Sequence, residues 1–115
     1  MNKRQKGSEQ EILAAGFLRQ SGYEILCLNF SSKTGEIDII GLENGILCFI
    51  EVKYRRNLNT GFPAEAVTAS KQTKIIRTSE YYMMLNHLTG IDRRYDIVEI
   101  VGNRIRLIRN AFGGV

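Results

Sequence analysis

Residues 35–53 read GEIDIIGLENGILCFIEVK and carry acidic and basic side chains at a spacing that could bind a metal ion. Asn44 and Gly45 predict a two-residue type I′ turn, because both positions of that turn need φ > 0. A hairpin with this turn places Asp38 opposite Glu51 on one face of a sheet. Two carboxylates held so close repel each other, and a divalent cation relieves the repulsion because hard cations bind several carboxylate oxygens.

Lys53 follows Glu51 by two residues, so we expect it on the same strand face, opposite Glu36. There it would place a positive charge beside a bound metal without being a ligand. The alternative is that these are ordinary strand residues with solvated charges, since an E-x-K triplet alone is weak evidence. The apolar sequences IDII and ILCFIEV favour the metal site, because charged residues in a buried sheet are usually paired or metal-bound.

The composition predicts one globular domain over residues 1–115. Of its 115 residues, 43% are hydrophobic and 24% are charged, which suits a single domain with its own core. No apolar run approaches the ~20 residues of a membrane span, and the basic N-terminus lacks the apolar stretch of a secretory signal. Cys27 and Cys48 lie in apolar runs without CxxC spacing, so we expect no zinc site and a reducing, cytoplasmic compartment.

The charge balance favours a polyanionic partner. The net charge is +4 and the pI is about 9.3, as is typical of many nucleic-acid-binding domains. The basic residues are clustered, and one cluster directly follows the candidate metal site. Four of them are expected to hold a nucleic-acid backbone without reading its sequence: Arg55, Arg56, Lys71 and Lys74.

Hydrophobic periodicity predicts the elements that position these side chains. The predicted order is a helix, three strands, a helix and two strands, which indicates an α/β domain with one mixed sheet flanked by helices. The helices are expected over 8–20 and 70–87, with a short one beginning near Pro63, and the strands over 23–30, 36–42, 46–54, 94–101 and 104–110.

The first helix is expected to begin with Ser8 as N-cap and Glu11 closing a capping box. Its core-facing stripe is read as residues 12, 13, 16, 17 and 20. Glu9, at the start of this stripe, has two interpretations that stay open. It is either an acid favoured by the helix dipole or a further ligand for the metal or its water.

The last two strands are joined by a tight turn at Gly102 and Asn103. The register that this turn sets pairs Glu99 with Arg106 and Asp96 with Arg109. We expect both pairs to be structural.

The motifs in this sequence resemble those of known protein families. GEIDII followed by FIEVKYR resembles the D…ExK core of the restriction-endonuclease-like (PD-(D/E)xK) nuclease superfamily. The wider pattern is similar to the YraN-like family of small bacterial proteins, and it spans nearly the whole chain. That pattern comprises Glu9, GEIDII at 35–40, IEVKYR at 50–55, Gly-Phe-Pro at 61–63, Lys71 and RYDIV at 94–98.

The resemblance implies an α-β-β-β-α-β nuclease core with a further strand, similar in layout to archaeal Holliday-junction resolvases. It implies that Asp38 and Glu51 bind Mg²⁺ or Mn²⁺, and that Lys53 orients the attacking water or stabilises developing charge. Glu9 would match the first-helix acid of the resolvases. The implied function is metal-dependent hydrolysis of nucleic acid, as in a structure-specific DNA endonuclease.

Two other functions stay open at this point. One is a non-catalytic nucleic-acid-binding module with the same fold, since fold does not imply function. The other is an interaction protein whose acidic site holds a cation. The choice between DNA and RNA, between junction and flap, and between a monomer and a homodimer is also open.

Overall fold

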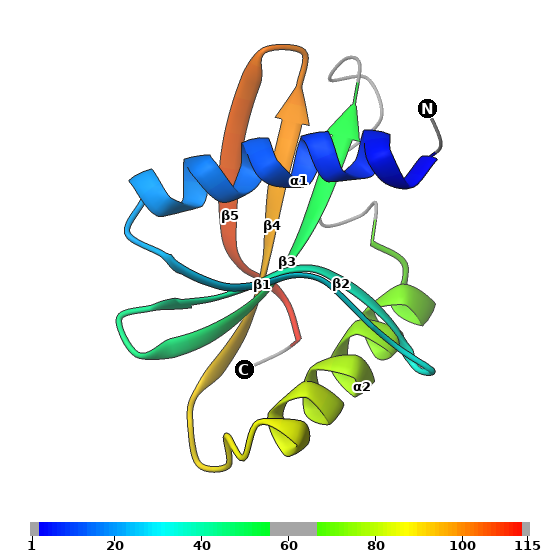
Figure 1. Ribbon diagram of the computed structural model, residues 1–115, viewed down its shortest axis with the longest axis vertical. Coiled ribbons are helices and arrows are strands. Elements are labelled where there is room, and N and C mark those ends of the chain that lie inside the picture. Colours follow the sequence, from blue (N-terminus) through cyan, green and yellow to red (C-terminus); the bar gives the residue numbers. More distant parts are fainter. Residues whose placement is uncertain (1–2, 56–66, 114–115) are drawn as a thin grey trace.

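The computed structural model describes residues 3–55 and 67–113, with side chains from residue 9 onward. The order of elements is the predicted one, α-β-β-β-α-β followed by a further strand (Figure 1). The short helix expected near Pro63 falls outside the described residues. The elements are α1 Lys3–Gln20, β1 Glu24–Ser32, β2 Gly35–Glu43, β3 Ile46–Arg55, α2 Ala69–Leu85, β4 Arg93–Val101 and β5 Arg104–Phe112.

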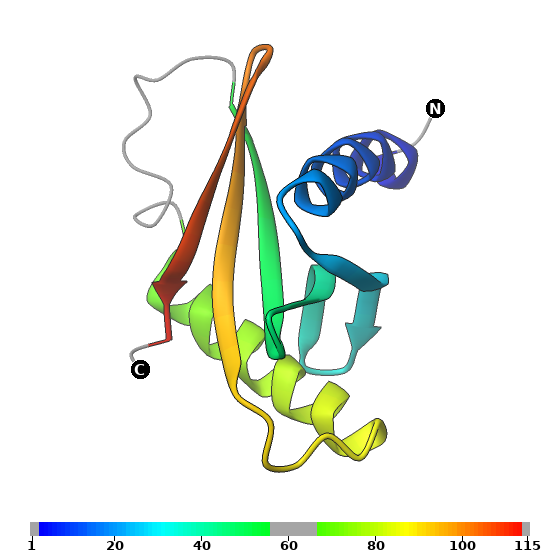
Figure 2. The same ribbon diagram turned by 90° about the vertical axis from the view of Figure 1, so that its left-hand side faces the viewer.

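The five strands form one mixed sheet in the order β1-β2-β3-β4-β5. Only the β3–β4 pair among them is parallel, because α2 carries the chain back across the sheet between these strands. The two helices lie on opposite faces of the sheet (Figure 2). Neither described helix is long and apolar enough to cross a membrane.

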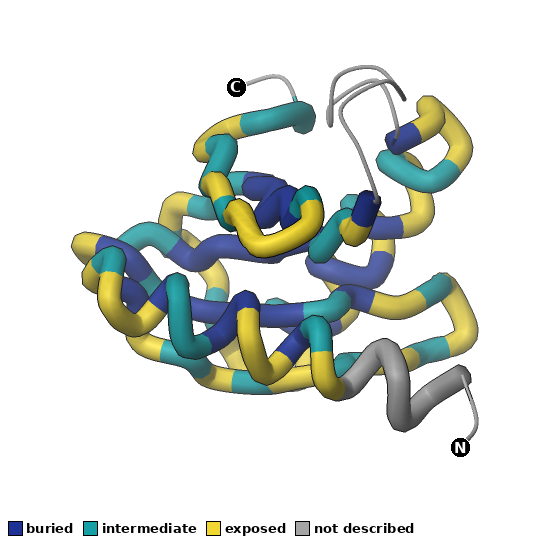
Figure 3. The backbone as a smooth tube through the Cα atoms, turned by 90° about the horizontal axis from the view of Figure 1, so that it is seen from above, coloured by how far each residue is buried: buried dark blue, intermediate teal, exposed yellow. Residues whose placement is uncertain are grey.

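Each helix buries a separate hydrophobic core against the sheet, and the buried residues run through the middle of the molecule (Figure 3). The predicted face of α1 is wrong. Ile12 and Leu13 are 63% and 50% exposed, whereas Ala14, Ala15 and Leu18 are buried. The stripe that packs on the sheet therefore consists of two alanines and Leu18, and it includes the buried Glu11.

The start of α1 also differs from the prediction. The helix begins at Lys3, so Ser8 lies inside it and is not its N-cap. In α2 the cap is conventional: Thr68 precedes the helix in an extended conformation, and its Oγ1 accepts a hydrogen bond from the Lys71 backbone N–H at 3.2 Å. This cap satisfies one of the backbone N–H groups that the first turn of α2 leaves without a helical partner.

The β2–β3 hairpin turns where the sequence predicts. Asn44 and Gly45 have φ of 52° and 79°, and the ladder runs from the pair Glu43–Ile46 to the pair Ile39–Ile50 in the expected register.

Beyond that last pair, β2 leaves β3. The β2–β3 pairing does not continue past that pair, so Asp38 and Glu51 are not ladder partners and the predicted Glu36–Lys53 pair is wrong. On their other edges, Glu36 pairs with Ser31 of β1 and Lys53 pairs with Glu99 of β4. The reason is local: the Val52 N–H donates to the Asp38 carboxylate at 2.8 Å instead of extending the ladder to a backbone carbonyl of β2.

The β4–β5 hairpin confirms one predicted ion pair and corrects the other. Glu99 pairs with Arg106, whose Nε donates to Glu99 Oε1 at 2.7 Å. The Asp96–Arg109 pair is wrong, because a β-bulge shifts the register next to Asp96. Arg109 instead donates to both oxygens of Glu43, at 2.8 and 2.6 Å.

A buried polar network ties the turn end of the β2–β3 hairpin to β4 and β5. Arg94 donates to Glu43 at 2.6 Å and to Asp96 at 2.8 Å, and the Tyr23 hydroxyl donates to Asp96 at 2.8 Å. Hydrogen bonds from Arg109 and Arg94 lower the pKa of Glu43 to about 2. The hairpin is therefore anchored at its turn, opposite the end that carries Asp38.

Candidate active site

Two carboxylates meet where β2 separates from β3. Glu51 is 6% exposed, and the Asp38 carboxylate is fixed beside it by the Val52 N–H. Two lysines reach the same carboxylate: Lys71 Nζ lies 2.6 Å and Lys53 Nζ 3.8 Å from Glu51 Oε1. The structure thus brings together the three residues predicted from the hairpin and adds a lysine from α2.

Asp38, Glu51 and Lys71 open onto a cavity of about 220 Å³ between the sheet and α2. Such a volume accommodates several water molecules, since a water occupies about 30 Å³ of liquid. The cavity is lined by Gly35, Glu36, Asp38, Glu51, Lys71, Lys74 and Ile75. Of the four predicted nucleic-acid contacts, Lys71 and Lys74 therefore lie at the site itself.

The electrostatics of the site oppose the charged form of Asp38. Burial, followed by repulsion from Glu51, raises the pKa of Asp38 to about 8, although the hydrogen bond from Val52 works against this rise. Glu11 repels Asp38 as well. A carboxyl whose pKa is raised toward neutral pH by burial and by a like charge is typical of functional sites.

Glu11, not Glu9, is the acid that α1 brings to this site. Glu9 is exposed. Glu11 is 7% exposed and shares a hydrogen bond with Asp38, and its pKa is raised by burial and by repulsion from Glu36 and Glu51. The sequence contains a signal for this residue, because Glu11 lies three, four and seven positions before the buried Ala14, Ala15 and Leu18.

The pKa values of the two site lysines, Lys53 and Lys71, are shifted in opposite directions. Burial and the neighbouring Lys71 lower the pKa of Lys53. Burial also acts to lower the pKa of Lys71, but its ion pair with Glu51 outweighs this and the pKa is raised. Lys71 therefore neutralises part of the negative charge of Asp38 and Glu51, and Lys53 adds a second positive charge to the site.

The predicted phosphate contacts at the end of β3 have a different outcome. Arg55 is buried, with its Nε 3.7 Å from Glu99 Oε2, so its guanidinium is directed to a neighbouring strand. Arg56 lies outside the described residues.

The donor set fits a hydrated Mg²⁺ or Mn²⁺. Over residues 9–55 and 67–113, no three His, Cys, Asp or Glu side chains are arranged to hold a metal ion together. Mg²⁺ does not need such a cage, because it keeps several waters and binds through one or two carboxylates. Asp38 and Glu51 are the two carboxylates that could hold such an ion, and the cavity that they line has room for the waters.

Comparison with known proteins places the chain in a family. The model of "Uncharacterised protein family UPF0102" matches residues 10–100. The chain belongs to this family.

A UPF0102 protein of Lachnoclostridium phytofermentans is 47% identical over 113 residues, which cover 97% of this chain and 96% of the relative. UPF0102 proteins of Caldicellulosiruptor saccharolyticus and Clostridioides difficile are 43% and 40% identical, and each match covers 97% of this chain and 100% of the relative. UPF0102 is the YraN-like family, so the expected membership of that family is confirmed.

Proposed function

We propose that this protein is a cytoplasmic, metal-dependent nuclease that hydrolyses phosphodiester bonds, with branched DNA as its substrate. One observation carries the proposal: Asp38 and Glu51 converge on a cavity with Lys53 and Lys71 beside them. Acidic ligands next to cations are the combination that phosphodiester hydrolysis needs, because a metal must be held and a polyanionic phosphate must be attracted.

Asp38 and Glu51 are the residues that would hold Mg²⁺ or Mn²⁺. A metal bound there supplies a Lewis acid and lowers the pKa of a coordinated water. The Val52 N–H keeps Asp38 oriented toward the cavity. Glu11, which shares a hydrogen bond with Asp38, sits where it can accept a proton from the acid or from a water beside it.

The lysines act on the phosphate. Lys53 is a compact cation that stabilises negative charge on the phosphate oxygens. An approaching phosphate also relieves the repulsion between Lys53 and Lys71 that lowers the pKa of Lys53. Lys74 lines the same cavity from α2 and holds the backbone beside the scissile bond.

A second candidate function is a nucleic-acid-binding module without catalysis. The observation in its favour is the Lys71–Glu51 ion pair at 2.6 Å, which neutralises one carboxylate without a metal. This candidate predicts binding with no metal requirement and no cleavage.

The deciding experiment incubates purified protein with a four-way DNA junction, a flap, a linear duplex and a single-stranded RNA, with Mg²⁺, with Mn²⁺ or with a chelator. We expect metal-dependent cleavage that Asp38→Asn and Glu51→Gln abolish. Glu24→Gln, which removes an exposed acid from β1, is the matched control and should cleave normally. Binding without cleavage in every condition would favour the module, and cleavage that survives Asp38→Asn would place the activity elsewhere.

A further inference from the structure

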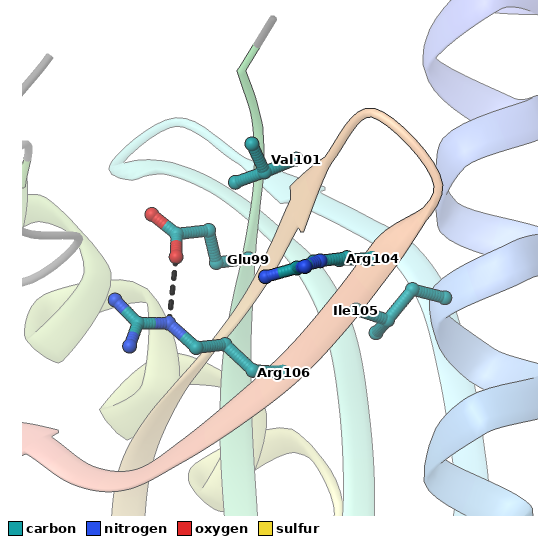
Figure 4. Close-up of a pocket in the computed structure, with 5 residues that line it drawn as sticks. All are labelled: Glu99, Val101, Arg104, Ile105 and Arg106. Carbon is teal, nitrogen blue, oxygen red and sulfur yellow. Dashed lines mark hydrogen bonds and ion pairs between the residues drawn. The ribbon is translucent and has the colours of Figure 1, made fainter. Parts of the chain in front are cut away.

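A second cavity, of about 360 Å³, lies at the outer end of the β4–β5 hairpin and is lined by two arginines (Figure 4). Its lining residues are Glu99, Val101, Arg104, Ile105 and Arg106. Arg104 and Arg106 are two residues apart on β5, so both side chains lie on one face of the sheet. Both arginines are exposed.

The strand registers connect this cavity to the candidate active site. Lys53 of β3 pairs with Glu99 of β4, which pairs with Arg106 of β5. Residues paired across neighbouring strands share a face, so these three side chains form a row. Two strand spacings separate Lys53 from Arg106, or about 10 Å. One strand of duplex DNA carries a phosphate per about 3.4 Å of axis, so this distance spans roughly three phosphates.

Glu99 holds Arg106 in position without cancelling the charge of the row. The Glu99 carboxylate is 1% exposed and accepts from Arg106 Nε at 2.7 Å. It is also paired with Arg55, 3.7 Å away. Figure 4 shows the terminal nitrogens of Arg106 pointing away from Glu99, and the Arg106 side chain is 56% exposed. A guanidinium fixed through Nε still presents donors that match a phosphate.

The helices leave this end of the sheet accessible. Figure 2 shows the β4–β5 hairpin extending past α2, while α1 lies on the opposite face. We propose that Arg104 and Arg106 bind the phosphate backbone of the nucleic-acid substrate a few nucleotides from the scissile bond. This inference rests on the proposed function, because it takes the substrate of the Asp38–Glu51 site to be nucleic acid.

The test measures binding of a fluorescein-labelled four-way DNA junction at several salt concentrations, with a chelator present so that cleavage cannot intervene. The proteins are the wild type, Arg104→Gln, Arg106→Gln and their double variant. Arg19→Gln is the matched control, since Arg19 is an exposed arginine in the last turn of α1. Arg106→Lys keeps a positive partner for Glu99, and Lys74→Gln reports on the active-site cavity.

Each phosphate contact contributes about 0.9 to the slope of log affinity against log salt concentration. We expect a loss of about one unit in each single glutamine variant, about two in the double variant, and none in Arg19→Gln. Arg106→Lys should retain most of the slope. Thermal melting checks that each variant is folded. If Arg106→Gln is unstable, the salt slope of Arg104→Gln alone tests the inference, because Arg104 is exposed.

Two results overturn the inference and are distinguishable. If Arg104→Gln keeps the wild-type slope while Lys74→Gln lowers it, the backbone is held at the active site but not along β5. If the wild-type protein binds neither the junction nor a linear duplex, the proposed function fails together with this inference.

Discussion

The raised pKa of Asp38 predicts an unusual dependence of stability on pH in the metal-free protein. The folded carboxyl keeps its proton up to about pH 8, whereas the unfolded one releases it near its ordinary value of 3.8. Between these values the folded state binds more protons than the unfolded state. Stability from this group is therefore fully present below about pH 3.8 and is lost as the pH rises to about 8.

The magnitude follows from linkage. One proton held by the folded state and not by the unfolded state changes the free energy of unfolding by at most about 1.36 kcal/mol per pH unit. Over the two units from about pH 5 to about pH 7, Asp38 should lower the free energy of unfolding by up to about 2.7 kcal/mol. This is a large fraction of the 5–15 kcal/mol that stabilises a typical domain.

Asp38→Asn is the perturbation that isolates this effect. The amide carries no charge at any of these pH values, and its oxygen can still accept the Val52 N–H. Urea unfolding followed by circular dichroism, with a chelator, gives the free energy of unfolding of both proteins at pH 5, 6 and 7. The free energy of unfolding of the variant should rise relative to that of the wild type by up to about 2.7 kcal/mol over this range, because the variant lacks the carboxyl whose proton the folded state retains.

The same unfolding measurement can be repeated with metal present. A ligand that binds only the folded state stabilises it, so Mg²⁺ at about pH 8 should stabilise the wild type and leave Asp38→Asn almost unchanged. Parallel pH profiles of the two proteins would refute the reasoning, because they would mean that Asp38 ionises in the folded protein as easily as in the unfolded one.

Three further predictions concern the lysines of the site and the polar network. Lys53→Ala should abolish cleavage while calorimetry finds Mg²⁺ affinity close to that of the wild type, and a large loss of affinity would make Lys53 part of the metal site. Lys71→Met should bind Mg²⁺ about tenfold more tightly, equivalent to about 1.4 kcal/mol, because the cation that competes for Glu51 is gone. Weaker binding in this variant would show that Lys71 supports the metal. Glu43→Gln should lower the free energy of unfolding by about 2 kcal/mol, since Arg109 loses its carboxylate partner and Arg94 keeps only Asp96, and urea unfolding with an unchanged midpoint would contradict this.

The part of the site that depends on local geometry is predictable from the sequence. Asn44 and Gly45 force a two-residue turn, and the turn sets the register of β2 and β3 as far as the pair Ile39–Ile50. The meeting of Asp38 and Glu51 follows from that register. The fork beyond it does not, because it depends on a side chain taking the Val52 N–H from the ladder.

The predicted face of α1 is wrong for a physical reason. Ile12 and Leu13 are large and apolar, and periodicity alone favours placing such residues in the core. The helix instead packs through Ala14 and Ala15, since small residues allow a close approach to the sheet. Once the stripe is rotated onto the alanines, Glu11 moves to the sheet and Glu9 to the solvent.

Contacts between strands that are distant in the sequence are the least predictable from it. Arg55 is paired with Glu99, and the two residues meet because β3 and β4 become parallel neighbours across α2. No local pattern states which strands will be neighbours. The β-bulge beside Asp96 is likewise a tertiary feature, and it redirects Arg109 to Glu43.

The position of β5 at the edge of the sheet has a consequence for self-association. An edge strand presents unpaired backbone groups to which a strand of another molecule can add, and charged side chains discourage such addition. β5 carries three exposed arginines, Arg104, Arg106 and Arg109. A second molecule approaching edge to edge would bring like charges together. Removing several of these arginines at once would therefore make the protein prone to aggregate, even where each single replacement leaves the fold intact.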